Sequence, residues 1–300
     1  MADPLRVPAR ADTVRAQFDA RAARFGAHDA VVREIGNRLI ERLQFIRLEP
    51  QRVLDVGCGS GAALVALAAR FPSAVPAGLD LSEAMLRQKA GAWRTRLPRW
   101  LGGRAPLTVV GDAAQLPLAG DTVDLLFSNL MLHWHPAPHT LFPEWKRVLR
   151  VGGLLLFSCF GPDTLKELRA ACRLTLPHAR PMPFIDMHDF GDMMVASGLA
   201  DPVMDAEVLT LTYASPRELL REVRALGGNP RADRYDRLPS GRQARSLLDA
   251  LAARRSDDGR LHLTVEVAYG HAWKAAARSD VAVVGVDTLR ADLARRRGSR

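Results

Sequence analysis

The sequence predicts an α/β fold built on a mostly parallel, seven-stranded sheet, and three observations support this prediction. Short apolar runs alternate with amphipathic stretches from residue 52 to residue 160. Most of these runs are apolar throughout, which is typical of strands that helices cover on both faces. The last run, LHLTVEVAYGHAWKA at 261–275, alternates apolar with polar residues and is expected to join the sheet antiparallel.

Helices are expected before and between the strands. Residues 13–48 have apolar side chains at spacings of three and four, which predicts helix. Ser82 is a favoured N-cap residue for a helix over 82–93. Thr164 and Glu167 have the spacing of a capping box, so another helix is expected to begin at Thr164. The predicted strands are 52–56, 75–80, 107–112, 123–129, 152–160, 202–213 and 261–275, and the remaining predicted helices are 62–71, 140–150, 188–199, 215–227 and 240–255.

One main domain with two appendages is expected. Residues 1–48 would form an N-terminal helical cap, and residues 49–275 the α/β domain, with a lid at about 161–190. Residues 276–300 would form a basic tail, whose last eleven residues hold five arginines and one aspartate. That surplus of four leaves about +5 of the net charge of +9 for the rest of the chain. A mildly basic body suits an acidic protein partner or an anionic substrate, and it does not require nucleic acid.

The sequence also predicts the compartment. No apolar run approaches the ~20 residues of a transmembrane helix, and the N-terminus lacks the apolar core of a secretory signal. Cys58, Cys159 and Cys172 have no paired spacing typical of disulfides or zinc. We therefore expect a cytoplasmic protein with no membrane or nucleic-acid partner, whose oligomeric state the sequence leaves open.

The glycine-rich loop VLDVGCGSG is the clearest candidate for a ligand site. Gly57, Gly59 and Gly61 follow a predicted strand, and parallel sheets bind ligands at the carboxyl ends of their strands. The dinucleotide fingerprint G-x-G-x-x-G would need a glycine where this chain has Ala62. Asp55 would repel a pyrophosphate but can receive an ammonium group.

Two further carboxylates follow neighbouring strands. Asp80 ends the second strand, nineteen residues after Gly61, where a carboxylate can accept both ribose hydroxyls of an adenosine. Asp112, followed by Ala113, ends the third strand, where it can accept from an adenine amino group. An ammonium partner, a ribose partner and an adenine partner on three successive strands fit S-adenosyl-L-methionine, which has no phosphate.

The motifs DVGCGSG, LDLSEAML and GDAAQLPLAGDTVDLLFSN occur in the order and spacing of class I S-adenosylmethionine-dependent methyltransferases, which the chain resembles. The resemblance implies a Rossmann-like domain that converts the donor to S-adenosyl-L-homocysteine. It also implies that Cys58, Leu81 and Met85, within these motifs, belong to the donor site.

A second resemblance extends over about residues 14–275. AQFDARAARFGAHDAVVREIGNRLIERL, SNLMLHWHP, FSCFGPDTLKELRAAC and VEVAYGHAWK are similar to a group with two branches. One branch contains malonyl-[acyl-carrier protein] O-methyltransferases of biotin synthesis, and implies an acyl carrier protein bearing a malonyl thioester as partner. The other contains mitochondrial complex I assembly factors that hydroxylate a protein arginine. The chain has no iron triad or flavin motif, which favours the first branch; a methyltransferase of another small molecule and a non-catalytic binding module are further alternatives.

The motif SNLMLHWHP follows the fourth strand and is expected beside the transferred methyl group. Asn129 is expected to contact the methionine portion of the donor. His133 and Trp134 would either form a wall of the acceptor site or pack a helix onto the sheet. Pro136 and Pro138 interrupt the nearby histidines, and no carboxylate or cysteine joins them at ligand spacing, so no metal site is expected.

Two other segments are candidates for acceptor binding. Phe18 and Phe25 lie seven residues apart, on one helical face, and would either shield the donor from water or pack the helix onto the sheet. The segment RTRLPRWLGGR at 94–104 places four arginines around Trp100. It would either dock an acidic carrier protein or form a solvated loop.

Overall fold

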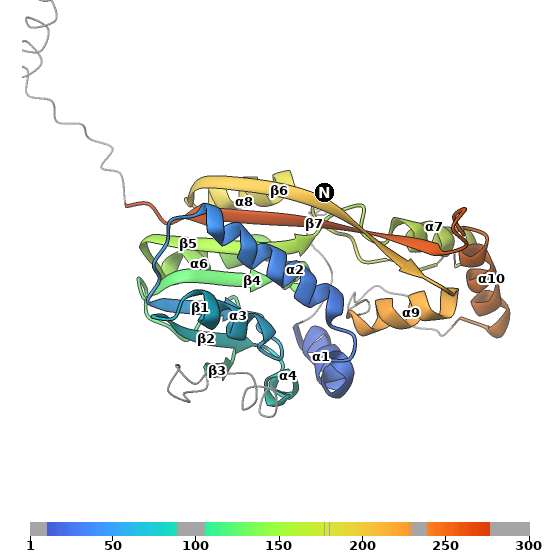
Figure 1. Ribbon diagram of the computed structural model, residues 1–300, viewed down its shortest axis with the longest axis horizontal. Helices are drawn as coiled ribbons and strands as arrows, with labels where there is room; N and C mark the ends of the chain where they lie inside the picture. Colours follow the sequence, from blue (N-terminus) through green and yellow to red (C-terminus); the bar gives the residue numbers. More distant parts are fainter. Residues whose placement is uncertain are drawn as a thin grey trace, which may run out of the picture.

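A seven-stranded sheet organises the protein (Figure 1). The computed structural model describes residues 11–88, 106–176, 178–179, 181–227, 229 and 239–276. The strand order is β3-β2-β1-β4-β5-β7-β6. Neighbouring strands from β3 to β5 pair parallel, whereas β7 is antiparallel to both β5 and β6. The predicted α/β class, the seven strands and the antiparallel last strand are therefore confirmed.

The elements have the following bounds. The strands are β1 (Arg52–Val56), β2 (Val75–Asp80), β3 (Leu107–Val110), β4 (Val123–Asn129), β5 (Leu149–Phe160), β6 (Ala200–Tyr213) and β7 (Leu261–Trp273). The α-helices are α1 (Ala11–Phe25), α2 (Ala30–Glu41), α3 (Ala62–Arg70), α4 (Glu83–Arg87), α6 (Leu141–Val148), α7 (Lys166–Thr175), α8 (Met187–Ala196), α9 (Pro216–Ala225) and α10 (Gly241–Ala252). Short 3-10 turns are η1 (Arg42–Phe45), η3 (Leu132–Trp134) and η4 (Pro138–Thr140).

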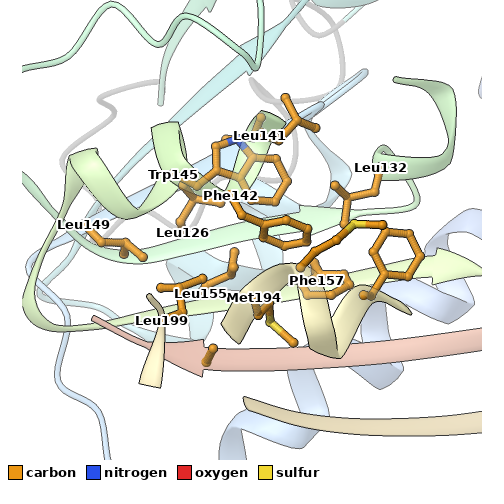
Figure 2. Packing of buried hydrophobic residues seen from close by; sticks show 14 of the residues in the cluster. Leu126, Leu132, Leu141, Phe142, Trp145, Leu149, Leu155, Phe157, Met194 and Leu199 are labelled. Atoms are coloured by element: carbon orange, nitrogen blue, oxygen red, sulfur yellow. The ribbon is translucent and has the colours of Figure 1, made fainter. Parts of the chain in front are cut away.

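Helices bury both faces of the sheet, which explains the continuous apolar runs. Leu154 and Leu156 of β5 join the core beneath α2 and α3, while Leu155 and Phe157 join the core beneath α6 and α8. Figure 2 shows this second core, where Phe157 and the helix residues Phe142 and Trp145 pack together. Because alternate residues of a strand point to opposite faces, apolar residues are needed on both faces of such a strand. Each large side chain buried here contributes about 1.5–3 kcal/mol.

Strands β6 and β7 extend well beyond the rest of the sheet. The pairing of β5 with β7 covers only the Val267–Trp273 part, so residues 261–266 of β7 pair with β6 alone. The extended ribbon carries α7, α9 and α10 (Figure 1). A small separate core that includes Tyr213, Leu219 and Leu263 holds α9 on it. This extension brings α9 next to α1, which lies far from it in sequence (Figure 1).

Two predicted helix boundaries were wrong. The helical region predicted over 13–48 is interrupted, because α1 ends at Phe25 and Gly26 begins a turn. The N–H groups of Ala27 and His28 donate to the carbonyls of Arg24 and Phe25 in this turn, and a second helix, α2, begins at Ala30. Ser82, in contrast, caps α4 as predicted, since its side chain accepts a hydrogen bond from the N–H of Met85. Residues 89–93 of that predicted helix lie outside the described residues.

The predicted capping box at Thr164 and Glu167 does not form either. The Thr164 Oγ1 donates to the Glu266 carbonyl at 2.9 Å, and the Glu167 carboxylate accepts from the backbone and hydroxyl of Thr264. Both side chains therefore bind β7, and α7 begins at Lys166 after a left-handed Leu165 (φ 60°). Groups on β7 therefore bind the two side chains that a local cap would use.

No helix in the described ranges combines the length and the apolar character needed to cross a bilayer.

Candidate active site

A cavity of about 950 Å³ lies at the carboxyl ends of β1, β2 and β4 and beneath α1. The individual residues that the sequence predicted for the donor or for the wall of the acceptor site all line it. These residues are Phe18, Phe25, Asp55, Gly57, Cys58, Gly59, Gly61, Asp80, Leu81, Met85, Asp112, Ala113, Asn129, His133 and Trp134. The topology of a parallel sheet accounts for most of this convergence, because successive strand ends meet at one edge.

The glycine loop is fixed by its backbone. Gly57, Gly59 and Gly61 all have left-handed φ angles (78°, 53° and 81°), which side chains strongly disfavour. The N–H groups of Gly57 and Cys58 both donate to the Leu79 carbonyl, at 2.7 and 3.0 Å. A Cβ on Gly57 would stand 2.5 Å from the Met131 side chain. The loop therefore holds its shape only with glycine at this position.

The carboxylate of Asp80 connects this loop to the start of α4. Its Oδ2 accepts from the Gly59 N–H at 2.7 Å, and its Oδ1 accepts from the Ser82 N–H at 2.8 Å. These two bonds fix the carboxylate between the glycine loop and the start of α4. Asp112 is held similarly, with its Oδ1 accepting from the Ala114 N–H at 2.8 Å. Both carboxylates are thus oriented before any ligand arrives.

Asp55 and Asn129 form the inner end of the cavity. Asp55 is 1% exposed and lines the cavity from the end of β1. Asn129 uses both ends of its amide within the protein: Nδ2 donates to the Val32 carbonyl at 2.9 Å, and Oδ1 accepts from the Ser158 hydroxyl at 2.7 Å. Asn129 therefore ties α2 to β4 and β5, and its predicted contact with the donor stays a prediction.

His133 is buried in an aromatic cluster at the other end of the cavity. It is 4% exposed, and its ring lies 5.0 Å from Trp134, 4.7 Å from Phe160 and 5.8 Å from Phe184 between centroids. Within the described part of the chain, neither ring nitrogen has a hydrogen-bond partner. Burial lowers the pKa of His133 to about 3. The side chain is therefore neutral at pH 7, with one N–H donor and one acceptor both unused.

Helix α1 and the end of α9 cover this side of the cavity. Phe18 packs edge-on against Trp134, with ring centroids 5.2 Å apart, and also contacts Phe25 at 6.3 Å. Asp19 of α1 accepts a hydrogen bond from the Ser82 hydroxyl at 2.5 Å, which joins this helix to the donor side. Leu226 contributes to the lining from just beyond α9.

Among the lining residues that the sequence missed, three are instructive for different reasons. Phe160 ends β5 and Met131 follows β4, so the rule that located Asp80 could also have found them. Leu226 carries no local signal, because only the β6–β7 extension brings it to the cavity. Of the predicted lid at 161–190, no described residue lines the cavity, although Phe184 packs against the His133 ring. The arginine-rich segment 94–104 and residues 277–300 of the predicted tail lie outside the described residues.

Relatives of known function and structure match this arrangement. The Methyltransferase domain family matches residues 54–157. A malonyl-[acyl-carrier protein] O-methyltransferase of Laribacter hongkongensis is 44% identical over 269 residues, which cover 88% of this chain and 90% of that protein. One of the same name from a Methylovorus species is 41% identical and covers 88% and 89%.

Solved structures agree on the fold. The YcgJ protein of Bacillus subtilis superposes with a TM-score of 0.56 at 16% identity, over 80% of this chain and 99% of that one. A phosphoethanolamine N-methyltransferase of Haemonchus contortus, in complex with S-adenosylhomocysteine, gives 0.50 at 17% identity, over 80% and 53%. At these identities the likeness concerns the architecture alone.

Proposed function

The chain belongs to the malonyl-[acyl-carrier protein] O-methyltransferase family, and we propose that it methylates the free carboxylate of a malonyl thioester on an acyl carrier protein. The observation that carries the proposal is the extent of the match. The first five relatives are 38–44% identical to this chain, and their alignments cover 87–89% of it. The match therefore includes the residues proposed for the acceptor side as well as the donor loop. We also retain the cytoplasm as the compartment in this proposal.

The donor, S-adenosylmethionine, fits the residues present at the carboxyl edge of the sheet. The glycine loop would let the ligand approach the backbone closely, and Asp80 would accept hydrogen bonds from the ribose hydroxyls. Asp112 would accept from the adenine amino group, and Asp55 would face the ammonium group. When bound, the donor supplies an electrophilic methyl group on a positively charged sulfur.

The acceptor side needs alignment more than acid–base chemistry. A malonyl carboxylate is ionised at neutral pH, so no side chain has to remove a proton from it. The neutral His133 ring would donate its N–H to the acceptor, which would satisfy a buried donor that has no protein partner among the described residues. His133 would thus position the acceptor rather than act as a base.

The aromatic and apolar walls would exclude water from the reacting groups. Val14, Phe18 and Trp134 form one cluster on the α1 side of the cavity. Transfer would form a bond between a carboxylate oxygen and the methyl carbon while the bond from that carbon to sulfur breaks. The products would be an ester and a thioether, so the opposite charges of carboxylate and sulfonium would disappear along the reaction. A dry site makes their attraction stronger and removes the hydration shell of the carboxylate.

The experiment uses purified protein, methyl-labelled donor and malonyl-acyl carrier protein. We expect the labelled methyl group to appear on the malonyl group of the carrier, as a base-labile methyl ester. Acetyl-carrier, which lacks the free carboxylate, is the matched control and should remain unlabelled. Donor binding in calorimetry without ester formation would overturn the proposal. Oxygen-dependent gain of one oxygen on a protein arginine would instead establish the hydroxylase branch.

A further inference from the structure

The solvent face of α9 carries a row of arginines without acidic partners. Arg217, Arg221 and Arg224 lie at spacings of four and three, so they share one face of the helix, and all three are exposed. The acidic residues of this helix are engaged elsewhere. Glu218 accepts from the Ala214 N–H at 3.0 Å, and Glu222 contacts His28 at 3.1 Å. Among the described residues, none of the three arginines has an ion-pair partner, so the helix face is positive.

Helix α1 packs beside α9 and leaves the row of arginines exposed to solvent. Gln17 donates to the Asn229 carbonyl at 3.2 Å, and His28 contacts Glu222, so the Glu222 side of α9 faces the α1 segment. At about 100° per residue, Glu222 lies about 100° or more around the helix from each arginine of the row. We call Arg217, Arg221 and Arg224 the arginine face.

The helix that carries the arginine face ends at the active-site cavity. The residue after α9, Leu226, lines the cavity, and the next residue, Gly227, touches Trp134 so closely that a Cβ there would lie 2.2 Å from the indole ring. A macromolecule bound to α9 would therefore have a short path to the wall formed by His133 and Trp134.

We propose that the arginine face docks a row of carboxylates on the acyl carrier protein, so that the carrier's thioester arm enters the cavity past Leu226. This inference rests on the function proposed above. Three arginines over seven residues span about 10 Å of helix, which matches carboxylates on successive turns of a partner helix. A single phosphate or small anion would not need such a convex, extended row. Arginine also binds carboxylates with paired hydrogen bonds, and complementary charge accelerates encounter.

The test reverses the charge of the row and compares two substrates. The variant Arg217→Glu/Arg221→Glu/Arg224→Glu should raise KM for malonyl-carrier about tenfold or more, with kcat little changed, because rim charges act mainly on association. Its activity on a small malonyl thioester, malonyl-N-acetylcysteamine, should stay unchanged. The wild-type kcat/KM for the carrier should fall with added salt, and the variant should lose that dependence.

The matched control makes the same change in net charge, but at the opposite edge of the sheet. Arg47, Arg52 and Arg70 are exposed near the beginning of β1 and the end of α3, and their replacement by glutamate should leave KM for the carrier unchanged. Equal KM increases in both variants would overturn the docking site, as would an α9 variant within twofold of wild type. Equal loss on carrier and small thioester would also overturn it. A wild-type enzyme inactive on both malonyl substrates would instead overturn the proposed function, and this inference with it.

Discussion

The donor side and the acceptor side of the cavity are built in different ways. The donor side comes from strand ends between Asp55 and Asn129, and backbone groups orient its loop and carboxylates. The acceptor side is assembled from side chains of α1, η3, the end of β5 and the residue after α9. The Methyltransferase domain match covers residues 54–157 and so includes only the first of these in full. In the proposed site, donor recognition would therefore be a local property of the chain, whereas acceptor recognition would depend on the tertiary arrangement.

The substitution Gly57→Ala tests this contrast with the largest expected effect. Gly57→Ala combines a left-handed φ of 78° with a Cβ 2.5 Å from Met131, so the loop has to move. We expect donor affinity in calorimetry to fall by about 100-fold or more, which corresponds to about 3 kcal/mol. Gly152→Ala is the matched control, because Gly152 also has φ 78° but nothing within 4 Å of its Cβ. Both variants should lose about 1–2 kcal/mol of stability from the backbone conformation, and only the first should lose donor binding. Equal donor affinities in the two would contradict a close-fitting loop.

Asp80→Ala is expected to have the next largest effect. Removing the carboxylate deletes the ribose acceptors and frees the N–H groups of Gly59 and Ser82. A charge-assisted hydrogen bond contributes about 1.5–3 kcal/mol, so donor affinity should fall about 10- to 100-fold. The exposed Glu83→Ala, three residues away, is the control and should bind the donor normally. Unchanged affinity in Asp80→Ala would remove this residue from the donor site.

The same contrast explains how far the sequence could predict the structure. Gly57, Asp80 and Asp112 were predicted as donor-binding residues because strand ends and their spacing are local signals; all three line the cavity, and their contacts with the donor stay a prediction. Leu226 was missed because its position depends on the long β6–β7 pairing, which no local pattern encodes.

Local rules failed where a distant strand offered better partners. Thr164 and Glu167 have the spacing of a capping box, but both side chains form hydrogen bonds with β7 instead. The pair Phe18 and Phe25 illustrates an intermediate case. Their shared helical face was predictable from spacing, but the contact of Phe18 with Trp134 requires the folded arrangement of α1 over η3.

The acceptor side should also be the acid-sensitive side. The folded pKa of His133 is about 3, below the ordinary value of 6.5, so the unfolded chain binds the proton more readily. Its contribution to stability is complete above pH 6.5 and is lost as pH falls toward 3. Each pH unit costs about 1.4 kcal/mol, or about 2 kcal/mol between pH 6.5 and 5. Urea unfolding of His133→Phe should show a smaller loss over that range than wild type. Parallel curves for His133→Phe and wild type would contradict this assignment.

The last prediction separates positioning from packing at His133. Phenylalanine keeps an aromatic ring between Trp134 and Phe160 but has no N–H to donate. We expect kcat/KM for the malonyl substrate to fall about tenfold, since one lost hydrogen bond to a carboxylate contributes about 1.5 kcal/mol. Donor affinity should stay within twofold, because the backbone of the donor side is untouched.

His133→Gln supplies the matched comparison. It restores an N–H donor but not the ring, so a positioning role predicts partial recovery of kcat/KM, and a packing role predicts a further loss together with lower stability. Kinetics and urea unfolding on the same three proteins distinguish these outcomes. Full activity in His133→Phe would assign the acceptor contact to another lining residue. It would leave His133 as part of the hydrophobic wall, with its buried nitrogens a cost to stability rather than a means of holding the substrate.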